Sequence, residues 1–291
     1  MGWLLLVSFI WAFSFGLIKG RLVGLDPVAV TVVRVGLAAL LFTPWIRVRP
    51  WGSTLIFRLL IIGALQFGLM YVLYLRAFVF LKAYEVALFT ITTPLYLVFF
   101  DALFERAWRP RYFLAALFAI VGAGLVVWQT GPGSTVWSGF ILVQASNVCF
   151  AAGQLAYRRL RPCFPSTVSD VHAFVWLGIG ALMATTLASL ATTPWLEFRP
   201  TSSQWLVLMY LGAVASGLGF FLWNLGATQV SAGVLAVCNN VKIPLGIACS
   251  LIFFHEQANL YRLTGSLLLL GLAIWVVESK PRKCISTAST S

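Results

Sequence analysis

Asn239, Asn240 and Lys242 lie in the middle of an apolar segment that runs from about residue 230 to residue 254. A helix of this length spans the roughly 30 Å hydrocarbon core of a bilayer, which puts Lys242 about 18 Å from either end. A lysine stem cannot carry its ammonium to the membrane surface over that distance. Asn239 and Lys242 share a helix face, and Pro244 leaves the carbonyl of Asn240 without its helical donor.

This polar cluster has two interpretations. A charge that faces lipid costs about 2.5 to 3.5 kcal/mol on insertion scales, so the ammonium of Lys242 should face a wet or protein-lined cavity. There it would be the counter-charge for a substrate carboxylate. Alternatively, the cluster packs helices together, because polar groups form hydrogen bonds between helices in membranes.

Other apolar segments also carry polar or aromatic groups that would meet at this depth. In the sixth segment, Gln144, Asn147 and Gln154 form one helical stripe, which would either line a cavity or bond to a neighbouring helix. In the third and eighth segments, aromatic rings beside amides would sandwich a flat, amphiphilic ligand or face lipid. The predicted substrate-binding residues are Gln66, Tyr71, Tyr74, Thr92, Asn147, Gln154, Trp223, Asn224, Asn239, Asn240 and Lys242.

Charged residues elsewhere indicate little chemistry. Arg34 starts seven residues inside the second segment, where we expect a snorkelling arginine at the membrane interface, although it could guide anions inwards. Glu85, Asp101 and Glu105 fall at segment ends, so no carboxylate at the midplane is available as a proton relay. No zinc-protease, serine-hydrolase, nucleotide-binding or CxxC pattern occurs. We therefore expect no enzyme, no catalytic residue, no metal site and no cofactor.

Composition indicates a polytopic membrane protein. Of the 291 residues 60% are hydrophobic and only 10% are charged, and the mean hydropathy is +0.94. Globular domains are about 25% charged. The formal charge of +12 is explained by the loops that flank the segments, and so it does not indicate a nucleic-acid partner. The bilayer and a small-molecule substrate are the expected partners, and a monomer is compatible with this pattern.

Apolar windows of about 20 residues predict an all-α fold with ten transmembrane helices. If the N-terminus is cytoplasmic, the inner loops and tail carry twelve Lys and Arg and the outer loops carry five, which favours cytoplasmic placement of both termini. The predicted helices cover residues 3–19, 28–46, 57–78, 84–104, 110–129, 137–157, 171–191, 204–225, 230–254 and 260–278.

The two halves of the chain also resemble each other. Gly63 and Gly68 recur 149 positions later as Gly212 and Gly217, and Pro94 corresponds to Pro244. The first five helices are then repeated by the second five. Because each repeat crosses the membrane an odd number of times, the second repeat inserts upside down relative to the first. Chance similarity between Leu-rich and Gly-rich helices is the alternative. The predicted organisation is a first repeat over 1–130, a second over 137–279, and a cytoplasmic tail over 280–291, with interruptions of the fourth and ninth helices at their prolines.

The sequence resembles the drug/metabolite transporter superfamily of EamA-like proteins. The resemblance covers nearly the whole chain and rests on residues 11–15 (WAFSF), 63–68 (GALQFG), 88–91 (LFTI), 151–154 (AAGQ) and 235–240 (LAVCNN). Within the superfamily it is most similar to the branch for carboxylates, amino acids and amines. It implies a multi-pass secondary transporter of the bacterial inner membrane that takes up biotin or a related small organic carboxylate by alternating access.

Two other functions stay open on these residues. An exporter of amino acids or of amphiphilic metabolites and drugs would use the same fold, because the direction of transport depends on coupling and gradients. An intramembrane enzyme or a receptor is the alternative of a different class, and it would need a pocket that opens to one side only.

Overall fold

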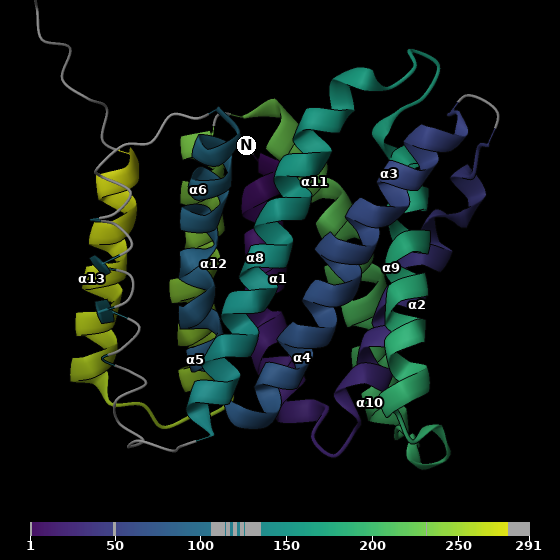
Figure 1. Ribbon diagram of the computed structural model, residues 1–291. Helices are drawn as coiled ribbons and strands as arrows, with labels where there is room; N and C mark the ends of the chain where they lie inside the picture. The colour runs from purple at the N-terminus through teal and green to yellow at the C-terminus, as the bar shows by residue number, and fades with distance from the viewer. Residues whose placement is uncertain are drawn as a thin grey trace, which may run out of the picture.

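The protein is a bundle of long helices, described here from a computed structural model (Figure 1). The structure describes residues 2–48, 51–105, 135–230 and 232–278, together with residues 114, 117, 118, 121, 122 and 125. Within these ranges every regular element is helical. Seven of the described helical segments are long and apolar enough to cross a membrane.

The helix boundaries follow the predicted segments closely, and the predicted helix 110–129 and the tail 280–291 lie largely or wholly outside the described residues. The first half contains α1 (Gly2–Arg21), α2 (Pro27–Phe42), α3 (Ser53–Gly63), α4 (Met70–Phe80), α5 (Ala83–Phe89) and α6 (Thr93–Glu105). The second half contains α8 (Val136–Leu160), α9 (Asp170–Thr192), α10 (Ser202–Met209), α11 (Gly219–Gln229), α12 (Ala232–Phe253) and α13 (Leu260–Glu278).

Two of the long helical segments contain a stretch of π-helix that the sequence did not predict. Residues Ala64–Leu69 join α3 to α4, and residues Tyr210–Leu218 join α10 to α11. Moved by 149 positions, the first stretch falls on residues 213–218, inside the second. A π-helix widens the turn and frees backbone groups from the usual i to i−4 bonds, and such stretches are frequent at functional sites.

The two prolines predicted to interrupt helices behave differently. Before Pro94 the chain forms a short 3₁₀ turn, Thr90–Thr92, that separates α5 from α6, so this interruption is confirmed. Pro244 lies inside α12, which stays helical throughout, so the predicted interruption there is wrong. Proline removes a single hydrogen bond from a helix, and packing of α12 along both α1 and α5 holds the remaining turns in place.

Helices of the first half pack mainly against helices of the second half. α1 lies along α12, α2 along α9, and α4 along α8. Glycines permit the closest approach: a methyl group at Gly63 of α3 would overlap the carbonyl oxygen of Leu177, and one at Gly180 of α9 would overlap that of Leu60. The interface between the halves therefore forms the core of the molecule.

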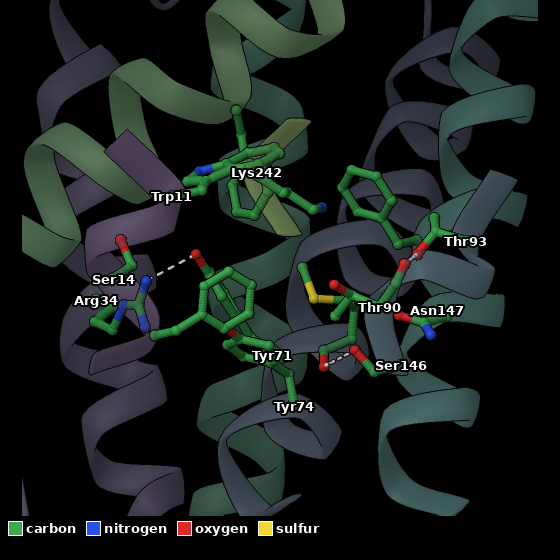
Figure 2. Close-up of a pocket in the computed structure, with 14 residues that line it drawn as sticks. Trp11, Ser14, Arg34, Tyr71, Tyr74, Thr90, Thr93, Ser146, Asn147 and Lys242 are labelled. Atoms are coloured by element: carbon green, nitrogen blue, oxygen red, sulfur yellow. Dashed lines mark hydrogen bonds between the residues drawn. The ribbon is translucent and has the colours of Figure 1, made fainter. Parts of the chain in front are cut away.

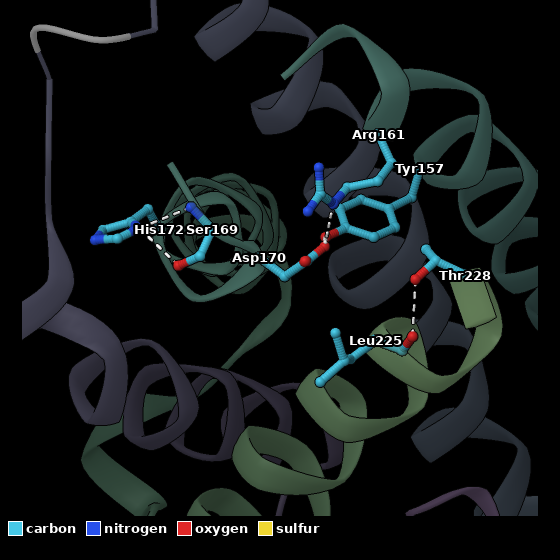
Figure 3. Close-up of polar contacts among 7 residues, drawn as sticks. All are labelled: Tyr157, Arg161, Ser169, Asp170, His172, Leu225 and Thr228. Atoms are coloured by element: carbon cyan, nitrogen blue, oxygen red, sulfur yellow. Dashed lines mark hydrogen bonds and ion pairs between the residues drawn. The ribbon is translucent and has the colours of Figure 1, made fainter. Parts of the chain in front are cut away.

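A polar cluster fixes the turn between α8 and α9 at the upper end of the bundle in Figure 1. Asp170, the first residue of α9, accepts hydrogen bonds through Oδ1 from Arg161 Nε at 2.7 Å and from the hydroxyl of Tyr157 at 2.6 Å (Figure 3). One residue earlier, Ser169 caps the helix together with His172. An acidic residue at a helix N-terminus and an arginine at a helix C-terminus both complement the helix dipoles.

At the opposite end of the bundle, a carboxylate from one half caps a helix of the other half. Glu256, in the connection between α12 and α13, accepts hydrogen bonds from the backbone amides of Ala83 and Tyr84 at 2.9 and 3.0 Å. These amides belong to the first turn of α5, where backbone N–H groups have no hydrogen-bond acceptor within the helix. The contact ties the α4–α5 turn to the α12–α13 connection.

Candidate functional site

A cavity of about 70 Å³ lies between the two halves (Figure 2). Its walls come from α1, α2, α4, α6, α8, α11, α12 and the 3₁₀ turn before α6. Pockets that hold drug-sized ligands measure about 300 to 1,000 Å³, so this cavity must widen before such a molecule can enter. It is lined by Trp11, Ser14, Phe15, Arg34, Met70, Tyr71, Tyr74, Thr90, Thr93, Ser146, Asn147, Phe150, Phe220 and Lys242.

Arg34 of α2 is one of two cations in this wall, and its side chain is 1% exposed. Its Nη2 donates to the hydroxyl of Tyr71 at 2.9 Å and to Oγ of Ser216 at 3.2 Å. The guanidinium also lies over the ring of Tyr71, 4.6 Å from its centroid. Nε and Nη1 have no hydrogen-bond partner among the described residues. The arginine is therefore held in place through one nitrogen and keeps its other donors free.

Lys242 of α12 is the second cation, and it is 7% exposed. Its ammonium donates to Oδ1 of Asn239 at 2.9 Å, one helical turn earlier. Two indole rings lie beside it, with centroids 5.0 Å away for Trp11 and 6.0 Å for Trp223. The indole nitrogen of Trp11 donates to the carbonyl of Ala215 at 2.9 Å, which anchors α1 to the π-helical stretch of the second half.

Neither cation is paired with an acid among the residues that the structure describes. The ion pairs among the described residues are Arg159 with Asp101 and Arg161 with Asp170, both outside the cavity, and no Asp or Glu belongs to the cavity wall. A buried charge without a counter-charge is costly in a low-dielectric interior. Two uncompensated cations facing one cavity therefore indicate a site for an anion.

Four of the predicted site residues line this cavity: Tyr71, Tyr74, Asn147 and Lys242. Asn147 is also tied to the 3₁₀ turn before α6. Its Nδ2 donates to the carbonyl of Phe89 at 2.9 Å and to the hydroxyl of Thr92 at 3.0 Å. Thr92 in turn donates to Oε1 of Gln144 at 2.7 Å. Thr92 thus lies behind the wall, where it orients Asn147.

Apart from Asn240, the other predicted residues are buried outside the cavity wall. Gln66 and Asn224 bond to each other between the halves, and Nε2 of Gln154 has no partner among the described residues. Trp223 and Asn239 both contact Lys242. The side chain of Asn240 lies outside what the structure describes.

The sequence interpretation missed the role of Arg34. Its position near the start of α2 indicates a snorkelling side chain, whereas the structure buries it in the cavity wall. The residues that hold it, Tyr71 and Ser216, are 37 and 182 positions away in the chain. Trp11 was likewise missed as a partner of Lys242. A signal was present: Arg34 lies within an otherwise uncharged apolar segment, as Lys242 does.

Comparison with known proteins finds relatives along the whole chain. The EamA-like transporter family matches residues 1–128 and 137–277. A biotin transporter of Escherichia coli (strain K12) is 38% identical over 279 residues, which cover 95% of this chain and 92% of the relative. A probable biotin transporter of Pseudomonas aeruginosa is 37% identical over 283 residues, covering 95% and 96%. One crystal structure of a protein with 18% sequence identity gives a TM-score of 0.66 over 94% of this chain and 96% of that chain, which shows likeness of fold alone.

Proposed function

The chain belongs to the EamA-like transporter family and is a multi-pass membrane transporter, and we propose that it imports biotin or a closely related small organic carboxylate. The observation that carries the substrate class is the pair of buried cations, Arg34 and Lys242, which face one cavity without an acidic partner in its wall. The names of the relatives support biotin within that class.

Within the cavity, each part of such a substrate has a matching surface. The cations supply counter-charge for a carboxylate, the hydroxyls and amides of Thr90, Thr93 and Asn147 supply hydrogen bonds, and the rings of Tyr71, Tyr74 and Phe220 cover apolar carbons. The remaining proposed substrate-binding residues, which are Gln66, Thr92, Gln154, Trp223, Asn224, Asn239 and Asn240, come into reach as the cavity widens.

We propose further that the chain has ten transmembrane helices in two inverted repeats, over residues 1–130 and 137–279. The separate family matches to each half support this arrangement. So does the correspondence between the π-helical stretches of the third and eighth helical segments. In inverted repeats the substrate site lies between the halves near the midplane, and this cavity also lies between the halves.

The contacts at the two ends of the bundle support alternating access. At one end Glu256 caps α5, and at the other Arg159 of α8 pairs with Asp101 of α6 at 3.1 Å. Each contact joins the two halves, and we expect the contact at the open end to break when the cavity opens there. We place the protein in the bacterial inner membrane with both termini in the cytoplasm, because the basic residues cluster in the loops on that side.

Uptake into liposomes tests the function directly. Reconstituted full-length protein should accumulate labelled biotin saturably, and unlabelled biotin should compete better than its uncharged amide, biotinamide. Repeating the assay with and without an imposed pH gradient tests whether protons drive transport. Arg76→Gln is the matched control, since it removes a half-buried arginine of α4 outside the cavity wall. Saturable transport of other carboxylates without biotin would overturn the substrate, and transport of no carboxylate would overturn the class.

A further inference from the structure

We propose that the two cations hold opposite ends of the substrate, so that Arg34 binds the carboxylate and Lys242 with Asn239 binds the carbonyl oxygen of the polar head group. This inference rests on the proposed function, because biotin carries a carboxylate at one end and a ureido ring at the other. Figure 2 shows that Arg34 and Lys242 enter the cavity from different helices, which suits a ligand with two polar ends.

Within the hydrogen-bond network of Arg34, Tyr71 and Ser216, only the guanidinium keeps free donors. Ser216 donates its hydroxyl hydrogen to the carbonyl of Leu211 at 2.7 Å. In the bond of 2.9 Å between Tyr71 and Ser216, the donor must therefore be Tyr71. Both hydroxyl hydrogens are used within the protein, and both oxygens accept from Nη2 of Arg34. Of these three groups only Arg34 has donors left for an anion, and Tyr71 and Ser216 act as positioning residues.

The free donors of Arg34 suit a carboxylate. A guanidinium has five N–H groups, and the two on Nη2 are occupied, which leaves the three on Nε and Nη1 without acceptors among the described residues. All of them are buried. A guanidinium stays charged in proteins, and its bonds to carboxylates are among the strongest hydrogen bonds that proteins form.

Lys242 and Arg34 differ in the geometry of their free donors. The ammonium of Lys242 bonds to Asn239 and lies near two indole faces, and its free hydrogens are on a single nitrogen. The guanidinium of Arg34 keeps free donors on two neighbouring nitrogens, Nε and Nη1, in a planar fork that matches the two oxygens of a carboxylate. The carboxylate is therefore assigned to Arg34.

The surroundings of Lys242 match a neutral carbonyl on a flat ring. Asn239 uses Oδ1 to accept from Lys242, so its Nδ2 is left as a buried donor without a partner among the described residues. The remaining ammonium hydrogens and this amide together offer donors to one carbonyl oxygen. Trp11 and Trp223, whose ring centroids are 5.0 Å apart, supply aromatic faces at the same end.

Binding of three compounds to purified full-length protein in nanodiscs separates the two roles. The compounds are biotin, biotinamide, which lacks the carboxylate charge, and 2-iminobiotin, which carries a protonated imine in place of the ureido carbonyl. The wild-type protein should prefer biotin to each analogue. Arg34→Gln should weaken biotin binding about ten- to a hundredfold, leave biotinamide nearly unchanged, and keep the preference against 2-iminobiotin.

Lys242→Met should do the reverse: it should keep the preference for biotin over biotinamide and lose the discrimination against 2-iminobiotin. Arg34→Lys, which retains a cation, should restore most of the preference for the carboxylate. Arg76→Gln should behave as the wild type does, and thermal unfolding of each variant verifies that it folds.

Other patterns overturn the assignment. If Lys242→Met abolishes the preference for biotin over biotinamide while Arg34→Gln keeps it, the two ends are reversed. If both substitutions abolish that preference, or neither does, the cations do not divide the ligand between them. Wild-type protein that binds none of the three compounds would overturn the proposed substrate, and the assignment with it, which distinguishes that failure from the others.

Discussion

Gln66 donates a hydrogen bond from Nε2 to Oδ1 of Asn224 at 3.0 Å, and it thereby joins the π-helical stretch of the first half to α11 of the second. Both side chains are at least 98% buried. Oε1 of Gln66 and Nδ2 of Asn224 have no partner among the described residues. The pair is thus a direct amide-to-amide contact between the two halves.

The energetic coupling of this pair is measurable by a double-mutant cycle. Gln66→Leu or Asn224→Leu alone leaves the remaining amide buried with even fewer partners, and each should reduce the free energy of unfolding by about 1 to 3 kcal/mol. The double substitution should cost less than the sum, because it removes both amides together. Thermal unfolding in detergent measures all three variants, and strictly additive effects would contradict a direct bond.

Gly63 and Gly180 should tolerate no side chain. In either Gly63→Ala or Gly180→Ala the new methyl would overlap a backbone carbonyl of the opposing helix, so α3 and α9 must separate, and the melting temperature should fall sharply. Gly271→Ala in α13 is the matched control, because nothing lies within 4 Å of its added methyl. Alanine favours a helix over glycine by about 1 kcal/mol, so the control should be neutral or slightly stabilising. Equal melting temperatures for all three variants would refute this close packing.

Single cysteines should distinguish the cavity wall from the packed interior. In a background without native cysteines, Asn147→Cys should react with a small hydrophilic thiol reagent, and biotin should slow the reaction, since Asn147 lines the cavity. Gln154→Cys on the same helix, two turns further on, should react slowly in the state described here, because Gln154 does not line the cavity. Fast labelling of Gln154→Cys together with slow labelling of Asn147→Cys would contradict this placement of the cavity wall.

The distribution of Lys and Arg also predicts the orientation of the protein in the membrane. A reporter that is active only in the periplasm, fused after Lys283, should be silent, whereas the same reporter inserted next to Arg199 should be active. The pair of fusions controls for expression. Activity at the C-terminal fusion would contradict both the orientation and the even number of membrane crossings.

The helix boundaries could be read from the sequence because they depend on local properties. Charged residues, prolines and glycines bound each apolar window, and α9 extends over Asp170–Thr192 where 171–191 was predicted. The π-helical stretches could not be read in this way. A stretch such as Ala64–Leu69 has the composition of an ordinary apolar helix, and its widened turns depend on which side chains pack against it.

The candidate site was predictable only in part, for the same reason. Lys242 and Asn147 are polar groups at membrane depth, which the sequence alone marks as unusual. Whether such a group reaches a cavity depends on neighbours from distant helices. Gln154 shares a helical stripe with Asn147 but is outside the wall, and Arg34 is inside it because Tyr71 and Ser216 hold its guanidinium there.

The small size of the cavity has a thermodynamic consequence for measured affinities. At about 70 Å³ it is smaller than the pockets that hold drug-sized ligands, so a ligand of the proposed class needs a wider conformer of the protein. The apparent dissociation constant equals the intrinsic one divided by the fraction of that conformer. A conformer present at about one part in a hundred weakens the apparent affinity a hundredfold, or about 2.7 kcal/mol. Substitutions that loosen the Glu256 cap on α5 can therefore tighten binding without touching the ligand, by raising the fraction of molecules ready to receive it.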